Sequence, residues 1–291
     1  MVYIMGADES SAWPMSDRPL SDRGLPPDAG AARPSRRFRT PRTIAALMLR
    51  EMQTSYGRTA GGYAWALLEP VGGIALLSWI VAIGFRIREP SLGTVFPLFM
   101  ATGMVLLTMF NGISRKVANA LTFSKPLLFY PGVAFTDALI ARFALWFLTQ
   151  LLVLYIILGG IFLIYDVPLL LDVGAMVAAV ALTALLALGV GVLNCFLFNM
   201  LPIWANVWGI LTTPLFLIST IFYVYEDIPR GYQDIAWWNP LIHVVGLMRR
   251  GVYSTYDATW ASPFYVACVG SATLLLGLVL LHRFHRDFLN R

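Results

Sequence analysis

The chain has 291 residues, of which 58% are hydrophobic and only 13% carry a charge. Because soluble domains usually carry about 25% charged residues, this composition excludes an ordinary soluble domain and indicates a chain that lies mostly in lipid. The formal net charge of +5 then fits arginine and lysine side chains beside a membrane, and we expect no nucleic-acid partner.

Residues 1–40 differ in composition from the rest of the chain. They contain several prolines among Ser, Asp, Gly and Arg, and they lack the apolar run of a signal peptide. Such a segment cannot bury enough apolar surface to offset the entropy lost on ordering. We therefore expect a disordered cytoplasmic tail over 1–40, followed by one transmembrane domain over 41–291.

Residues 41–57, PRTIAALMLREMQTSYG, have the pattern of a helix that lies on a membrane surface. Ile44, Leu47, Met48 and Met52 recur at helical spacing, and polar residues separate them. This pattern predicts an amphipathic helix in the cytoplasmic interface. Such a helix either receives a partner protein or serves only as an anchor.

Six apolar segments follow, and each is about long enough to cross the roughly 30 Å of hydrocarbon in a bilayer. The predicted fold is an all-α integral membrane protein with six transmembrane helices, at about 66–85, 95–113, 143–165, 173–198, 203–225 and 264–281. An even number places both termini on one side of the membrane, and arginine and lysine are more frequent on that side. The positive-inside rule therefore predicts that both termini are cytoplasmic.

The entry to the first apolar segment combines glycines with a Glu-Pro pair. Gly57 and Gly62 allow the backbone to turn sharply from the membrane plane into the segment. Pro70 suits the first turn of a helix, where its missing N–H has no cost. Glu69, directly before it, either caps the free N–H groups of that turn or pairs with Arg58 or a partner protein.

The connection between the fifth and sixth apolar segments is long for a structureless loop. It contains WNPLIHVVGLMRRGVYSTY, in which the Asn239-Pro240 pair is a plausible helix start. We expect short periplasmic or re-entrant helices over about 228–256, with Trp238 at the level of the lipid headgroups. His243 either contacts a ligand or has a hydrogen-bonded structural role, and we favour the structural role.

Motifs of several enzyme classes are missing from the sequence. It contains no G-x-x-x-x-G-K-[ST] loop for ATP phosphates, no H-E-x-x-H and no G-x-S-x-G. We therefore expect no catalytic residues and no bound metal. Cys195 and Cys268 lie in apolar runs, and we interpret both as inert core thiols. Carboxylates are nearly absent from the middle of the apolar segments, which disfavours proton-coupled transport and favours an energy source outside the chain.

Two stretches of the chain resemble motifs of a known family. LREMQTSYGRTAGGYAWALLEP, residues 49–70, and WNPLIHVVGLMRRGVYSTY, residues 238–256, are similar in order and spacing to motifs of permease subunits of ABC exporters for capsular polysaccharide. FSKPLLFYPGV resembles the loop of that family between its second and third spans. Gly246 departs from the pattern, which commonly has an acidic residue at this position. The resemblance covers about 41–290.

The resemblance implies a channel-forming subunit in the bacterial inner membrane that moves lipid-linked, anionic capsular polysaccharide from the cytoplasm to the periplasm. It implies a homodimer of this chain with two copies of a cytoplasmic ABC ATPase, which would bind ATP and Mg, and also periplasmic co-polymerase and outer-membrane export proteins. The candidate residues for coupling to the ATPase lie on the interface helix, just after it and on the basic loop after the second span: Arg50, Glu51, Arg58, Arg115, Lys116 and Lys125. The positive-inside rule alone would also account for the charges of that loop.

Aromatic and arginine side chains are the candidates for contact with the polymer. The predicted substrate path consists of Tyr63, Trp65, Trp79, Trp204, Trp208, Phe216 and Tyr223. Aromatic rings stack on sugars, but they also fill membrane cores and interface belts. The periplasmic candidates are Arg86, Arg88, Trp238, Asn239, His243, Arg249 and Arg250, and the arginines contact either the anionic polymer or lipid phosphates. Two alternative functions are export of an O-antigen or teichoic-acid-type polymer and the activity of a membrane-embedded glycan-modifying enzyme.

Overall fold

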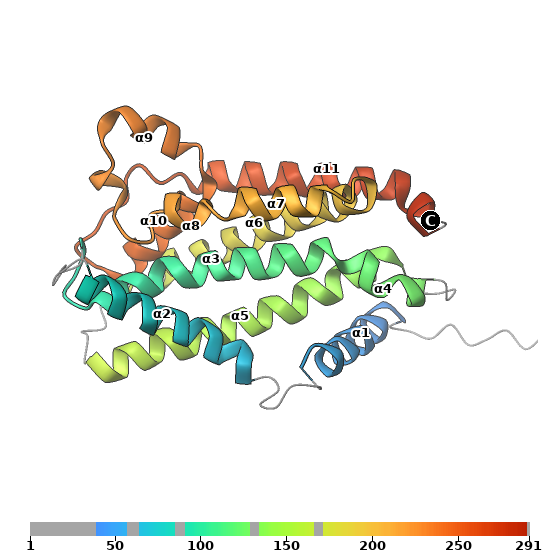
Figure 1. Ribbon diagram of the computed structural model, residues 1–291, viewed down its shortest axis with the longest axis horizontal. Helices are drawn as coiled ribbons and strands as arrows, with labels where there is room; N and C mark the ends of the chain where they lie inside the picture. The colour runs from blue at the N-terminus through green and yellow to red at the C-terminus, as the bar shows by residue number, and fades with distance from the viewer. Residues whose placement is uncertain (1–38, 57–63, 85–90, 129–133, 166–170, 290–291) are drawn as a thin grey trace, which may run out of the picture. The chain divides into compact units, whose positions relative to one another are not determined.

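A computed structural model describes residues 39–56, 64–84, 91–128, 134–165 and 171–289. The tail over 1–38 and the predicted site residues Gly57, Arg58, Gly62, Tyr63, Arg86 and Arg88 lie outside these ranges. Within them, every regular element is a helix (Figure 1). The elements are α1 (Arg39–Tyr56), α2 (Ala64–Gly84), α3 (Phe96–Ala118), α4 (Ala120–Leu128), α5 (Phe135–Tyr165), α6 (Val173–Met200), α7 (Trp204–Thr212), α8 (Leu215–Ile218), the 3-10 helix η2 (Tyr225–Asp227), α9 (Arg230–Trp237), α10 (Pro240–Val252) and α11 (Pro263–Leu289).

Four helices of the described chain are long and apolar enough to cross a membrane. These are α3, α5, α6 and α11, the last of them as far as Phe284. The first and fifth predicted spans correspond to shorter apolar stretches, Leu68–Ile80 in α2 and Trp204–Ile218 over α7 and α8. The all-α membrane fold is thus confirmed in its four long helices, whereas six crossings stay a prediction.

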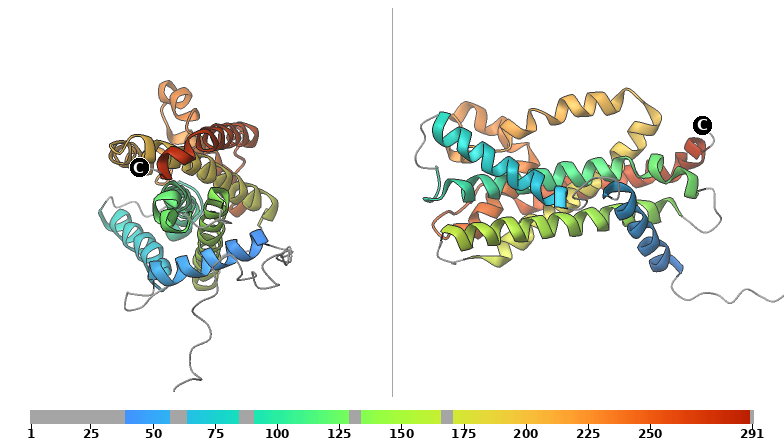
Figure 2. Two further views of the ribbon diagram at one scale, coloured as in Figure 1. Left: turned by 90° about the vertical axis from the view of Figure 1, so that its right-hand side faces the viewer. Right: turned by 60° about the horizontal axis from the view of Figure 1, so that its bottom comes forward.

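The helices α3 and α6 form the centre of the bundle. α6 packs against α11, α3 and α10, and α3 also packs against α5 and α2 (Figure 1). The view along the bundle in Figure 2 shows the other long helices arranged around this pair. The largest buried apolar side chains of α3, among them Phe99, Leu106, Met109 and Ile113, form the middle of the core.

Glycines bring α6 and α11 into close contact. A Cβ atom added at Gly189 of α6 would collide with the carbonyl oxygen of Gly270 in α11. A Cβ atom added at Gly277 of α11 would lie 2.7 Å from the backbone nitrogen of Leu193 in α6. Small residues at such contacts allow membrane helices to approach backbone to backbone.

The two cysteines have different environments. Cys195 on α6 is buried, whereas Cys268 on α11 is exposed. The interpretation of both as core thiols is therefore wrong for Cys268. Its apolar neighbours suit a helix surface that faces lipid as well as they suit a protein core, because lipid and core are equally apolar.

The first apolar helix starts earlier than its Glu-Pro pair suggests. α2 begins at Ala64, so Glu69 and Pro70 both lie inside the helix. The prediction that Pro70 occupies the first turn and that Glu69 caps it is wrong. Pro70 cannot donate a hydrogen bond to the carbonyl of the preceding turn, and membrane helices tolerate such an interior proline because neighbouring groups satisfy the freed carbonyl.

The fifth predicted span is broken. The apolar run over 203–225 predicts one continuous helix, but the chain is helical only over α7 and α8 and leaves the helix after Ile218. Pro214 separates α7 from α8, and Thr220 adopts a positive φ of 54°. Apart from Ser219 and Thr220 the side chains remain apolar or aromatic as far as Tyr225, so composition alone does not reveal the end of the helix.

The short helices η2, α9 and α10 follow this break. Asn239 caps α10, because its side-chain oxygen accepts a hydrogen bond from the Leu241 backbone at 3.0 Å, and Pro240 is the first helical residue. Every residue of α10 from Leu241 to Arg249 is buried. α10 is thus part of the core formed with α3 and α6 rather than a helix on the membrane surface.

Candidate functional site

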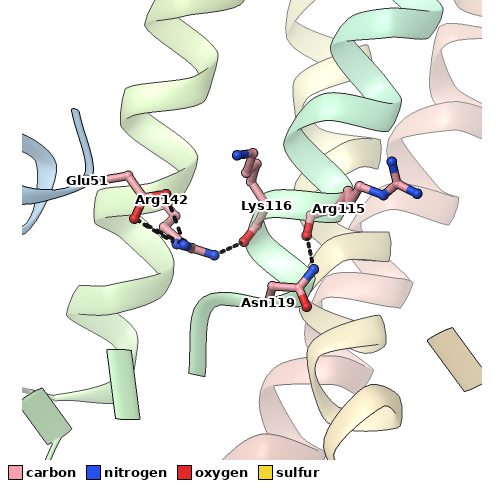
Figure 3. Close-up of polar contacts among 5 residues, drawn as sticks. All are labelled: Glu51, Arg115, Lys116, Asn119 and Arg142. Atoms are coloured by element: carbon pink, nitrogen blue, oxygen red, sulfur yellow. Dashed lines mark hydrogen bonds and ion pairs between the residues drawn. The ribbon is translucent and has the colours of Figure 1, made fainter. Parts of the chain in front are cut away.

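A buried ion pair joins the interface helix to the bundle (Figure 3). Arg142 lies about two turns after the start of α5, and Glu51 comes from α1. The Nη2 atom of Arg142 donates to both carboxylate oxygens of Glu51, at 2.9 and 3.1 Å, and its Nε atom donates to Oε2 at 3.3 Å. The relative exposures of the two residues are only 6% and 4%. The pair therefore has forked geometry and is almost dry, which makes charge-assisted hydrogen bonds strong.

Arg142 also contacts two further helices. Its Nη1 atom donates to the Lys116 carbonyl of α3 at 2.9 Å, and its guanidinium lies 4.2 Å from the ring centroid of Phe123 in α4. Lys116 is near the C-terminal end of α3, where carbonyls have no partner within the helix and a cation is favourable. Helices α1, α3, α4 and α5 thus meet at one guanidinium, and we call Glu51, Lys116, Phe123 and Arg142 the Arg142 junction.

The turn between α3 and α4 is fixed next to this junction. The Nδ2 atom of Asn119 donates to the Arg115 carbonyl at 2.8 Å, so the side chain closes the end of α3 (Figure 3). The Lys116 ammonium lies 4.1 Å from the ring centroid of Trp146 on α5, which is a cation–π contact. α4 therefore follows α3 after one residue in a defined direction.

The structure separates the predicted coupling residues into two kinds. Glu51 and Lys116 belong to the Arg142 junction, and the Glu51 carboxylate is bound inside the chain. Arg115 is exposed, and Arg50 and Lys125 are partly exposed, on the same group of helices. The Arg50 guanidinium lies 5.5 Å from the Phe123 ring, next to the junction.

Arg142 and Phe123 are the functional candidates that sequence reasoning missed. A single arginine within the 31 mostly apolar residues of α5 is the signal that could have identified the first of them. Charged residues in a membrane helix usually face a partner inside the bundle. Nothing in one sequence indicates that the partner is Glu51, which lies 91 positions earlier.

His243 has both ring nitrogens in hydrogen bonds within the protein. Nε2 donates to the Trp237 carbonyl at 2.8 Å, and Nδ1 accepts from the Ser262 backbone N–H at 3.1 Å. The rings of Trp237 and Trp260 contact the imidazole. Burial lowers the pKa of His243, so the neutral ring is favoured. This arrangement supports the structural role of His243 and leaves no ring nitrogen for catalysis.

We expect replacement of His243 by Gln to change the pH dependence of stability. Because its pKa is lower in the folded chain than the usual 6.5, the unfolded chain binds the proton more readily, and stability should fall as the pH drops below about 6.5. Between pH 7.5 and 5.5, the melting temperature of the parent chain should fall further than that of His243→Gln. His282→Gln, at an exposed position of α11, is the matched control. An equal fall in melting temperature in the parent, His243→Gln and His282→Gln would contradict the lowered pKa of His243.

The two neighbouring arginines predicted on the periplasmic side have opposite environments. Arg250 is exposed and lies 3.7 Å from an oxygen of Asp257. Arg249 is only 1% exposed and points into the bundle toward backbone carbonyls. Trp238 is 69% exposed, and Asn239 is occupied as the cap of α10. Of the two arginines, Arg250 alone has the exposure that contact with a polymer or lipid phosphate requires.

The predicted aromatic path falls into two groups. Trp65 and Trp79 are more than half exposed on α2, which packs against α3 and α5. Trp204, Trp208, Phe216 and Tyr223 are partly buried and lie on α7, on α8 and after the break. The indole N–H of Trp204 donates to Asn194 at 3.0 Å.

Residues 42–253 match the sequence pattern of the membrane-protein family described as ABC-2 type transporter. The match includes most of α1, the Arg142 junction and α10 and covers more than half of the chain, so the chain belongs to this family. It is a permease subunit and not itself the catalytic component.

Relatives of the chain come from three bacterial species. The chain is 31% identical over 238 residues to the polysialic acid transport protein KpsM of Escherichia coli, covering 82% of this chain and 92% of that protein. It is 26% identical over 248 residues to the capsule polysaccharide export inner-membrane protein CtrC of Neisseria meningitidis serogroup B, and 28% identical over 246 residues to BexB of Haemophilus influenzae, with 84% of this chain and 92% of the relative covered in each case.

Proposed function

We propose that this chain is the inner-membrane permease of an ATP-driven exporter that moves lipid-linked capsular polysaccharide from the cytoplasm to the periplasm. The family assignment and the three relatives, whose names refer to polysialic acid or capsule export, support the transport role. The four long apolar helices agree with a multi-pass protein. A separate ATPase supplies the energy, because the sequence has no phosphate-binding loop.

The Arg142 junction is the observation that carries the coupling part of this proposal. The interface helix α1 and the short helix α4 are the elements that the family resemblance assigns to contact with the ATPase. Both meet the long helices α3 and α5 at one buried guanidinium. A displacement of α1 or α4 by the closing ATPase would therefore move α5 with it, because a dry, forked ion pair resists separation.

The proposed assembly contains two copies of this chain and two copies of the ATPase. Both termini lie in the cytoplasm in this scheme, which places α1, α4 and the exposed Arg115 on the side of the ATPase. α9 and α10 then lie toward the periplasm, where co-polymerase and outer-membrane partners would receive the polymer. The polymer is anionic and lipid-linked in this proposal, and Arg250 is an exposed cation on its side of exit.

Deletion of the gene in its own host tests the proposal. We expect the cell surface to lose its polysaccharide while full-length polymer accumulates in the cytoplasm, as measured by immunogold microscopy and polymer extraction. The unaltered gene supplied on a plasmid should restore export. Normal surface polymer in the deletion strain would refute the transport role. A chemically altered polymer at the surface would indicate a glycan-modifying enzyme.

A further inference from the structure

The break after α8 places irregular backbone inside the bundle. Residues 219–221 are almost fully buried, and Val224 is 7% exposed. Irregular backbone among membrane helices has no water to satisfy its N–H and C=O groups, so other protein groups must do so. We call Ser219–Val224 the buried break, and the question is which groups hold it.

Arg249 of α10 binds the carbonyls of the buried break. Its Nη1 atom donates to the Tyr223 carbonyl at 2.7 Å, and its Nη2 atom donates to the Ile221 carbonyl at 3.1 Å. Its guanidinium lies 4.0 Å from the ring centroid of Phe99 on α3. The two bound carbonyls are two residues apart, which suits the fixed fork of a guanidinium and not the single ammonium of a lysine.

Arg249 has no carboxylate within ion-pair distance among the described residues. Glu226 accepts hydrogen bonds from Tyr256 and Trp260, and Asp227 accepts one from the Val224 backbone. A buried cation is unfavourable unless other groups replace its water. Here two carbonyl dipoles and the face of an aromatic ring do so. The role of the buried guanidinium is thus to bind the backbone carbonyls of the buried break.

Further contacts hold the same segment from both sides. The Asn239 side chain donates to the Ser219 hydroxyl at 3.2 Å, and the Tyr223 hydroxyl donates to the Leu217 carbonyl at the end of α8 at 3.1 Å. A Cβ atom at Gly103 of α3 would lie 3.1 Å from the Cα atom of Ile221, so α3 approaches the break closely. Thr220, a β-branched residue at positive φ, adopts a conformation that persists only when its surroundings impose it.

From these contacts we infer that Arg249 is the positioning residue of the buried break. It binds the segment to α3 and α10 and thereby sets where α8, Phe216 and Tyr223 lie. Its importance for export rests on the proposed function, since Phe216 and Tyr223 are candidates for the polymer path. The local role of Arg249 does not depend on that function and can be tested without any polysaccharide.

Cysteine labelling tests this inference on the full-length chain in lipid nanodiscs. A background chain carries Cys268→Ser, to remove the exposed thiol, and Val224→Cys, to report on the break. Addition of Arg249→Met should raise the rate at which a water-soluble fluorescein maleimide labels position 224 by at least about tenfold, because the carbonyls then require water. Arg249→Lys should give an intermediate rate. Arg250→Met is the matched control, and its rate should stay within about twofold of the background, because Arg250 is exposed.

Equal labelling rates for Arg249→Met and Arg250→Met would overturn the inference. Cys195, which is fully buried on α6, reports on the global fold in the same samples. If Arg249→Met also exposes Cys195, the fold has been lost, and the Arg249→Lys variant is used instead. A labelling rate at position 224 above that of the background chain then supports the inference, and an equal rate overturns it. Normal surface polymer in the deletion strain would refute the proposed function but would not change these labelling rates. The failure of the proposed function and the failure of this inference are therefore distinguishable.

Discussion

Arg142→Met should separate ATP hydrolysis from export and should destabilise the chain by about 3–5 kcal/mol. The substitution leaves the Glu51 carboxylate buried without its cation, and removing one partner of a buried pair has a cost of this size. It also frees the Lys116 carbonyl and removes the guanidinium contacts that link α5 to α1 and α4. With the partner ATPase present, we expect ATP hydrolysis to continue while surface polymer is lost. The measurements are denaturant unfolding in detergent and capsule quantification in cells.

A double-mutant cycle distinguishes the pair from two independent effects. Glu51→Leu and Arg142→Met should each be strongly destabilising, whereas the double variant should be more stable than the sum of the two losses predicts, because no charge remains buried. Arg115→Gln, at an exposed position in the last turn of α3, is the matched control for loss of a positive charge near the junction. Additive losses in the cycle would show that the pair is not energetically coupled.

Gly189→Ala should destabilise the bundle by about 1–3 kcal/mol, the usual cost of overpacking a core. The added methyl group would collide with the Gly270 carbonyl and would also lie 3.0 Å from the Leu274 backbone nitrogen, so α6 and α11 would have to separate. A collision with backbone cannot be relieved by a change of rotamer. Thermal unfolding of the purified chain should show a clear fall in melting temperature.

Gly159→Ala is the matched control for this substitution. Gly159 lies in α5, and an added Cβ atom would have no neighbour within 4 Å. Alanine favours helix over glycine by about 1 kcal/mol, so this variant should be neutral or slightly stabilising. A melting temperature of Gly189→Ala equal to that of Gly159→Ala would show that the α6–α11 contact is looser than the structure indicates.

Apolar runs and helix caps predicted much of the fold. The runs over 95–113 and 173–198 correspond to α3 and α6, and the amphipathic pattern over 41–57 corresponds to α1, because these signals are local and periodic. The start of α2 and the break after Ile218 could not be predicted from composition. The helix α2 continues through Pro70, and the break lies in mostly apolar sequence, because a bundle tolerates an interior proline or irregular backbone if other side chains supply hydrogen bonds.

The candidate site was predicted less well than the fold, since its contacts join distant parts of the chain. Glu51 was recognised as a coupling candidate, but its partner Arg142 is 91 positions away. Arg249 and Arg250 are adjacent and chemically identical, so a single sequence assigns them the same role. On α10 they point in directions about 100° apart, and one enters the core while the other meets solvent.

Arg142 divides the long helix α5 into a short part and a long part. At 1.5 Å per residue, the part of α5 before Arg142 measures about 10 Å and the part after it about 35 Å. If the helix pivots where four helices hold it, this unequal lever amplifies movement: a shift of 1 Å at the short arm becomes about 3 Å at the far tip. In the proposed orientation, a small stroke at the cytoplasmic face of the membrane would thus produce a larger swing at the periplasmic face.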